Sequence, residues 1–155
     1  MAGGEDHKYE YVRFVVVGTD GRARLAQLGA AIAAIEAEKA TDEYHQVDLD
    51  DEMLKRLRPA FPNAVVDSLG APGDYDLESV LATMLMCEYD LLGVSEPSKG
   101  TADVQFFARA YPYGGVGSLI RLVQAFGFEV VGCNDGSGYA DFDMKDWPWA
   151  LRGEL

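Results

Sequence analysis

The sequence predicts an α+β fold: a two-layer α/β sandwich with one mixed or antiparallel sheet and helices mainly on one face. The length of 155 residues is typical of a single domain. Apolar residues make up 48% of the chain and charged residues 25%, as in folded globular proteins. Strand-like and helix-like segments follow each other in the order β-α-β-α-α-β-β-α-β-β, which suits helices packed on one sheet. A ferredoxin-like core with an insertion fits this order, and so do other layouts.

The first half of this pattern starts with a strand over residues 9–17, which are rich in β-branched and aromatic side chains. Residues 18–21, with two glycines, end the strand. Thr19 or Asp20 is then the expected N-cap of a helix over residues 22–39, whose apolar positions recur with helical spacing.

The middle of the chain predicts a short strand over residues 44–49 and a short helix over residues 51–58, which Pro59 ends. Proline and glycine make residues 59–74 the most loop-like zone. A helix capped by Asp76 then follows and continues to about residue 88.

The last third predicts a hairpin, a helix and a strand, with a final short strand beside it. The hairpin is expected because its second strand alternates well between small or apolar positions, from Ala102 to Ala110, and mostly polar positions, from Asp103 to Tyr111. The predicted elements are a strand over 89–95, a turn over 96–100, a strand over 101–111, a helix over 115–126 ended by Gly127, a strand over 128–133, a turn over 134–138 and a strand over 139–143.

Domain organisation and compartment follow from the termini and the cysteines. We expect residues 1–8 to be disordered, because they offer nothing to bury, and residues 9–155 to form a single globular domain. Two cysteines, Cys87 and Cys133, are too few for a disulfide framework, and both are expected to be buried thiols. With neither a signal-peptide pattern nor an apolar run long enough to span a bilayer, the cytoplasm is the expected compartment.

The net charge of −13 restricts the partners. A surface of this sign repels nucleic acid and anionic lipid, so we expect neither as a partner. It attracts a basic protein, although acidity that serves only solubility is the alternative.

Acids gather most densely just before and inside the short helix of the middle region. Those nearest the helix start are explained by the helix dipole, but the others are not. They predict an acidic face that binds a partner, with a plain solvated face as the alternative. His45 lies among them, but no second histidine has metal-ligand spacing, so we expect no metal and no cofactor. The acids are Asp42, Glu43, Asp48, Asp50, Asp51 and Glu52.

Two tryptophans near the C-terminus, Trp147 and Trp149, either close over the core or contact another chain, because exposed aromatic pairs are costly. We count them with the partner-binding residues.

A different class of function depends on a glycine-rich junction between a strand and a helix. Backbone N–H groups at such a junction can hold an anion, and Arg121 lies one turn into the helix. The segment fits neither of the known glycine-rich phosphate-binding motifs. It predicts, as an alternative, an anionic small-molecule site at Gly114, Gly115, Gly117, Ser118 and Arg121.

No nucleophile, base and orienting acid can be selected as a catalytic set, so a binding role is expected rather than an enzyme. The leading hypothesis is an acidic protein-binding module of inhibitor or immunity-protein type that engages a basic partner. The alternatives are the anionic-ligand domain or enzyme and a structural or oligomer-forming protein.

Overall fold

The computed structural model describes residues 10–70, 76–108, 115–134 and 139–141. The expected N-terminal disorder lies outside these residues. So do the turn over 135–138 and the two tryptophans.

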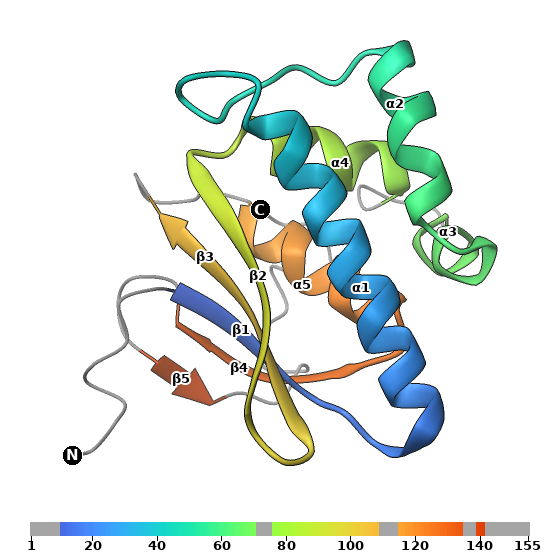
Figure 1. Ribbon diagram of the computed structural model, residues 1–155, viewed down its shortest axis with the longest axis vertical. Helices are drawn as coiled ribbons and strands as arrows, with labels where there is room; N and C mark the ends of the chain where they lie inside the picture. The colour runs from blue at the N-terminus through green and yellow to red at the C-terminus, as the bar shows by residue number, and fades with distance from the viewer. Residues whose placement is uncertain (1–9, 71–75, 109–114, 135–138, 142–155) are drawn as a thin grey trace.

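The described residues form an α+β fold in which one open sheet carries the helices on it, as predicted (Figure 1). The sheet has five strands in the order β2-β3-β1-β4-β5, and every neighbouring pair is antiparallel. The strands are β1 (Glu10–Val15), β2 (Tyr89–Ser98), β3 (Thr101–Ala108), β4 (Glu129–Asn134) and β5 (Tyr139–Asp141).

The connections select the ferredoxin-like layout among those the sequence allowed. Helix α1 (Gly18–Lys39) leads from β1 towards β2, and α5 (Gly115–Ala125) leads from β3 to β4. The hairpin of β2 and β3 lies on one side of β1, and β4 lies on the other. This is the interleaved β-α-β-β-α-β core. An insertion between α1 and β2 contains the remaining helices.

The insertion contains α2 (Asp51–Leu57), a 3-10 turn (Arg58–Ala60), α3 (Asn63–Leu69) and α4 (Leu77–Met86). Helix α4 begins at the predicted cap, since the Asp76 carboxylate accepts a hydrogen bond from the Ser79 N–H at 2.8 Å. Helix α3 is absent from the sequence prediction. The prolines of this region predict a loop. Val65 and Leu69 are buried in the common core, however, and their burial stabilises a helix there.

Two local predictions are wrong. Helix α1 begins at Gly18 rather than at residue 22, and neither Thr19 nor Asp20 caps it. Gly18 has φ of 71°, so the chain turns directly from β1 into the helix, and Val17 takes the N-cap position without a side-chain bond. Residues 44–49 are not a strand, because their backbone N–H groups bind Asp42 of the same loop and the Leu85 carbonyl of α4 rather than a neighbouring strand.

The hairpin also differs in its turn. Strand β2 continues to Ser98, which leaves only Lys99 and Gly100 between the strands. Gly100 has φ of 84°, the left-handed conformation that tight hairpin turns require.

The core lies between the sheet and the helices, and the predicted alternation of the strands is confirmed where they meet. Strand β3 directs Ala102, Val104 and Phe106 inwards, and all three are buried. On the opposite face of the sheet, Asp103 is 1% exposed and accepts two hydrogen bonds from the Arg13 guanidinium of β1, at 2.8 and 3.0 Å. This bidentate geometry fixes the cross-strand pair.

The two cysteines are thiols rather than disulfide partners, and their surroundings differ. Cys133 is buried, as predicted. Cys87 follows the last residue of α4 and is only partly buried, so that part of the prediction is wrong. Burial still raises the pKa of the Cys87 thiol.

Lys39, the last residue of α1, is a buried charge at the junction of α1, α4 and β2. Its side chain is 0% exposed, and Nζ donates to the carbonyl oxygens of Met84 at 2.8 Å and Cys87 at 2.7 Å. The ammonium also lies 4.9 Å from the centre of the Tyr89 ring. Burial lowers the pKa of Lys39 from 10.5 to about 8.

Stability is therefore expected to rise with pH above 8. Between pH 8 and 9.5 the unfolded chain keeps a proton on Lys39 that the folded chain loses, so the free energy of unfolding increases, by at most about 1.4 kcal/mol per pH unit. The Cys87 thiol acts in the opposite direction, so the measurement uses a Cys87→Ser background. Urea denaturation followed by circular dichroism checks the slope.

The control is Lys39→Met in the same background, for which the slope over this interval is expected to disappear. An equal slope in the two proteins contradicts the assignment of this pH dependence to Lys39.

Candidate functional site

The predicted acidic face lies on the connection between α1 and α2, residues 40–50, here called the acidic loop, and on the first turn of α2. Its start continues α1, with the Ala40 N–H bound to the Glu36 carbonyl at 2.8 Å. Its second half binds the end of α4: the Val47 N–H donates to the Leu85 carbonyl at 3.0 Å, and the Gln46 side-chain amide donates to the Met86 carbonyl at 2.9 Å. The loop is thus fixed to two helices.

Three of the six predicted acids have partners within the molecule. The Asp42 carboxylate accepts from the Tyr44 N–H at 2.9 Å and closes the first turn of the loop. Asp50 is the N-cap of α2 and accepts from the Met53 N–H at 2.8 Å. Glu52 lies 3.6 Å from Lys55 on the exposed side of α2.

The other three, Glu43, Asp48 and Asp51, are exposed. The part of the chain that the structure describes gives their carboxylates no hydrogen bond or ion pair. These three are therefore the acids of the predicted set that are free to meet another molecule.

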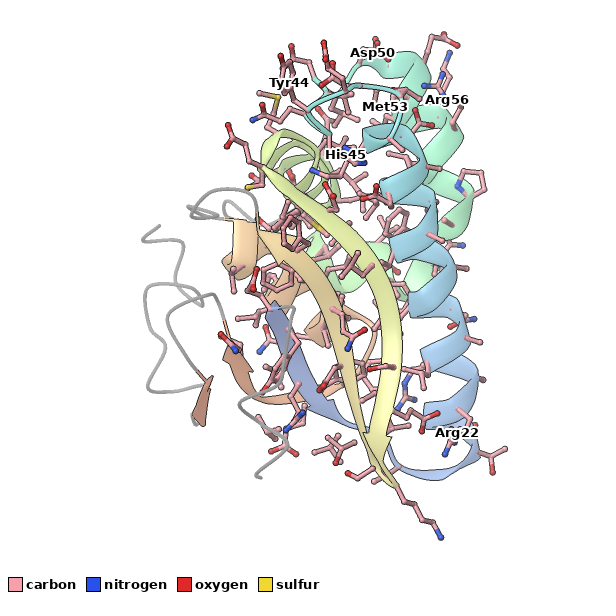
Figure 2. The ribbon with its side chains drawn as sticks, turned by 60° about the vertical axis from the view of Figure 1, so that its left-hand side comes forward. Arg22, Tyr44, His45, Asp50, Met53 and Arg56 are labelled. Atoms are coloured by element: carbon pink, nitrogen blue, oxygen red, sulfur yellow. The ribbon has the colours of Figure 1, made fainter. Side chains whose placement is uncertain are left out.

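Exposed apolar side chains lie at the same end of the molecule. Tyr44 is 63% exposed and Met86 is 45% exposed. Figure 2 shows Tyr44 and Asp50 together at the end opposite Arg22. Large exposed aromatic and methionine side chains are typical of protein contact sites.

A shallow depression beside Met86 joins the acidic loop to α4, with a volume of about 390 Å³. Its apolar and acidic lining residues come from segments that are far apart in the sequence. We define the acidic surface as Glu43, Asp48, Asp51 and Glu78 together with Tyr44 and Met86. The residues that line the depression are Asp48, Leu49, Asp76, Glu78, Ser79, Ala82 and Met86.

The acids and bases of this region are partly segregated. Arg56 on α2 makes two hydrogen bonds of 2.9 Å to the Glu38 carboxylate of α1, on the side of α2 that faces α1. This guanidinium holds the pKa of Glu38 below its usual range. Both charges are thereby used within the molecule, and they do not neutralise the acidic surface.

His45, in the middle of the acidic loop, lies between two carboxylates. Its Nε2 is 3.2 Å from Glu36 of α1, and its Nδ1 is 3.6 Å from Asp90 of β2. Burial raises the pKa of Glu36, although the Leu91 N–H, which donates to it at 2.8 Å, acts in the opposite direction. The sequence showed His45 but neither partner, because Asp90 is distant along the chain and Glu36 belongs to the preceding helix.

The glycine-rich junction stays a prediction. Gly114 lies outside the described residues, and Gly115 and Gly117 fall in the first turn of α5. Ser118 is buried, and the Arg121 guanidinium donates to the Ser68 carbonyl at the end of α3, at 3.1 Å. Among the described residues these contacts belong to the packing of α5 and α3.

Comparison with known proteins finds no match to this chain among protein-family models, curated proteins or solved structures. Within the described ranges, no three His, Cys, Asp or Glu side chains are grouped so that they could hold a metal ion. None of the described helices is long and apolar enough to cross a membrane.

Alanine substitutions are expected to separate the structural acids from the free ones. Asp42→Ala and Asp50→Ala should each lower the free energy of unfolding by about 1 kcal/mol, because each leaves a backbone N–H without its acceptor. Glu43→Ala and Asp48→Ala should leave it unchanged or raise it slightly, because they reduce repulsion between like charges. Urea denaturation measures all four, and equal losses in the two pairs would contradict this division.

Proposed function

We propose that this protein is a protein-binding module, of inhibitor or immunity-protein type, that engages a basic partner through the acidic surface. The observation that carries the proposal is the combination at one end of the molecule of free carboxylates and exposed apolar side chains. A net charge of −13 adds a long-range attraction for a basic protein.

The two kinds of side chain support different steps of binding. Glu43, Asp48 and Asp51 are exposed, so their attraction acts over distance and raises the rate of association. Tyr44 and Met86 offer area that a partner can cover, and such anchors mainly set the rate of dissociation.

The depression beside Met86 suits one kind of contact in particular. Its apolar lining residues Leu49, Ala82 and Met86 can cover the methylene stem of a lysine or arginine, and the carboxylates that line the same depression can pair with the charged end. A basic partner is thus supported by shape and chemistry as well as by net charge.

The fixed structure of the acidic loop also favours binding. Because Val47 and Gln46 bind the end of α4, a partner does not have to order the loop. Binding to an ordered surface avoids this entropic cost.

Replacing the free acids with Glu43→Gln, Asp48→Asn and Asp51→Asn is expected to slow association with a basic partner by about tenfold at low salt, with little change in dissociation. Added salt should reduce the wild-type association rate in the same way, because exposed charges are screened over about 8 Å near physiological ionic strength. Proteins captured from a lysate at low salt supply the partner, and surface plasmon resonance measures both rates.

The matched control removes three exposed acids elsewhere: Asp20→Asn on α1, Asp67→Asn on α3 and Glu129→Gln on β4. It changes the net charge by the same amount and should slow association far less. If the two triple variants bind alike, net charge alone attracts the partner and the acidic surface is only a solvated face.

A further inference from the structure

We infer that the contact surface for the basic partner continues from the acidic surface onto the β2–β3 hairpin, where Leu92 and Phe107 form a second apolar site, here called the hairpin site. Leu92 is 45% exposed and Phe107 is 44% exposed. The inference rests on the proposed function and extends its contact area from the insertion onto the sheet.

Exposed apolar side chains gather at one end of the molecule. The hairpin opens at the end that carries Met86, because β2 begins soon after α4 ends there (Figure 1). Phe107 lies close to the end of β3 and therefore at the same end. Among the large apolar side chains that are exposed in the described ranges, only Val17 lies elsewhere. It lies beside the hairpin turn, since the N–H of the preceding residue donates to the Gly100 carbonyl at 2.9 Å.

Leu92 is exposed because β2 contains a β-bulge. The register between β2 and β3 shifts between Leu91 and Gly93, so Leu92 is an extra residue in the ladder. Gly93 has φ of 121°, a conformation that favours glycine. Leu91 is buried in the core, whereas Leu92 beside it lies outside the core. The bulge thus places a large apolar side chain in contact with solvent.

Phe107 belongs to the same part of the hairpin. Phe106 points into the core, so Phe107 points to the face of the sheet away from the helices. Its cross-strand partner is Asp90, and Leu92 follows two residues later on β2. Residues in such diagonal positions lie roughly 7 to 8 Å apart. The two apolar side chains are therefore close enough to belong to one contact.

The edge of β2 favours a contact through side chains over the addition of a strand. β2 is the outermost strand on its side of the described sheet, and an edge of this kind can pair with a strand of another protein. The Leu91 N–H, however, already donates to the Glu36 carboxylate of α1 at 2.8 Å. The bulge at Leu92 also interrupts the regular edge that an added strand requires. The apolar side chains are then what the hairpin offers to a partner.

The charge of the surroundings favours a basic protein over a second copy of this chain. Glu88 lies between Met86 and β2 and is exposed, and the described part of the chain gives its carboxylate no hydrogen bond or ion pair. A second copy brings the same net charge of −13, so long-range repulsion opposes self-association. A basic protein is attracted, and Glu88 lies along the chain between the acidic surface and the hairpin site.

The size of a typical interface joins the two sites. Stable interfaces bury about 800 Å² on each partner and contain roughly 20 to 30 residues a side. The acidic surface contains far fewer residues, so a stable complex also covers neighbouring parts of the molecule. The hairpin site is next to it through the short connection between α4 and β2. It therefore supplies apolar area that slows dissociation.

The photo-reactive amino acid p-benzoylphenylalanine identifies what each site contacts. It replaces Tyr44 in one chain and Phe107 in another, and both chains are expected to cross-link to the same basic protein in a lysate at low salt, as identified by mass spectrometry. A third chain with the probe in place of Val17 is the control and should capture this protein far less. Cross-linking at position 44 alone, cross-linking of the two positions to different proteins, or cross-linking of two copies of this chain through position 107 overturns the inference.

Leu92→Thr combined with Phe107→Thr measures what the hairpin site contributes to the complex with the protein cross-linked at position 44. Threonine keeps the preference for a strand but removes most of the apolar area. The double variant is expected to dissociate about tenfold faster, with an association rate within about twofold of the wild type. Surface plasmon resonance measures both rates, and circular dichroism checks that the variant is folded. The cross-linking result decides the inference by itself if the double variant does not fold.

Val17→Thr is the matched control, because it removes an exposed apolar side chain at the opposite end of the molecule. Its two rates should equal those of the wild type. If the double variant dissociates no faster than this control, the hairpin site lies outside the contact and the inference is overturned. The proposed function then still stands if the variant without the free acids associates slowly. If position 44 cross-links to no protein, the proposed function fails and the extension fails with it.

Discussion

The buried ammonium of Lys39 is the interaction on which the candidate site depends. A helix end leaves its last carbonyl groups without partners in the helix, and the last turn of α4 is close to the core. Lys39 supplies donors to the carbonyls of Met84 and Cys87, while the acidic loop supplies Val47 N–H to Leu85 and the Gln46 amide to Met86. The end of α1, the acidic loop and the end of α4 are thus joined in one hydrogen-bonded unit.

Burying a charge is costly, and the lowered pKa of Lys39 measures part of that cost. The three carbonyl oxygens within 3.5 Å of Nζ and the face of Tyr89 offset it without a direct ion pair. An apolar side chain at this position would avoid the cost of burying a charge, but it would leave the carbonyls unpaired. The charge therefore fixes the position of α4 against α1. It thereby also fixes the α4 residues that line the depression.

The ferredoxin-like core and its insertion have different roles in the structure. The sheet, α1 and α5 contain most of the buried apolar side chains, including Phe14 and Phe106. The insertion contributes α4 and the acidic loop, which present the exposed Tyr44 and Met86 together with the free acids. His45 lies where the insertion meets the core, between Glu36 of α1 and Asp90 of β2.

The sequence by itself determined features that depend on a few neighbouring residues. Asp76 caps α4 because its carboxylate reaches the N–H three residues on, and strand β3 alternates because side chains in a strand point to opposite faces. The tertiary structure decided the rest. It made a helix of residues 63–69 by burying Val65 and Leu69. It kept residues 44–49 out of the sheet, because the His45 N–H binds the Asp42 carbonyl of the same loop and the Val47 N–H binds the Leu85 carbonyl of α4. Only folding brings Glu78 and Asp48 to the same depression and buries Lys39 against the end of α4. It also places His45 between Glu36 and Asp90. Apart from His45 with Glu36, these contacts join residues about 30 to 50 positions apart along the chain. Local hydrogen bonding and periodicity are visible in a single sequence, whereas the energy of a distant contact depends on which surfaces the whole chain buries together.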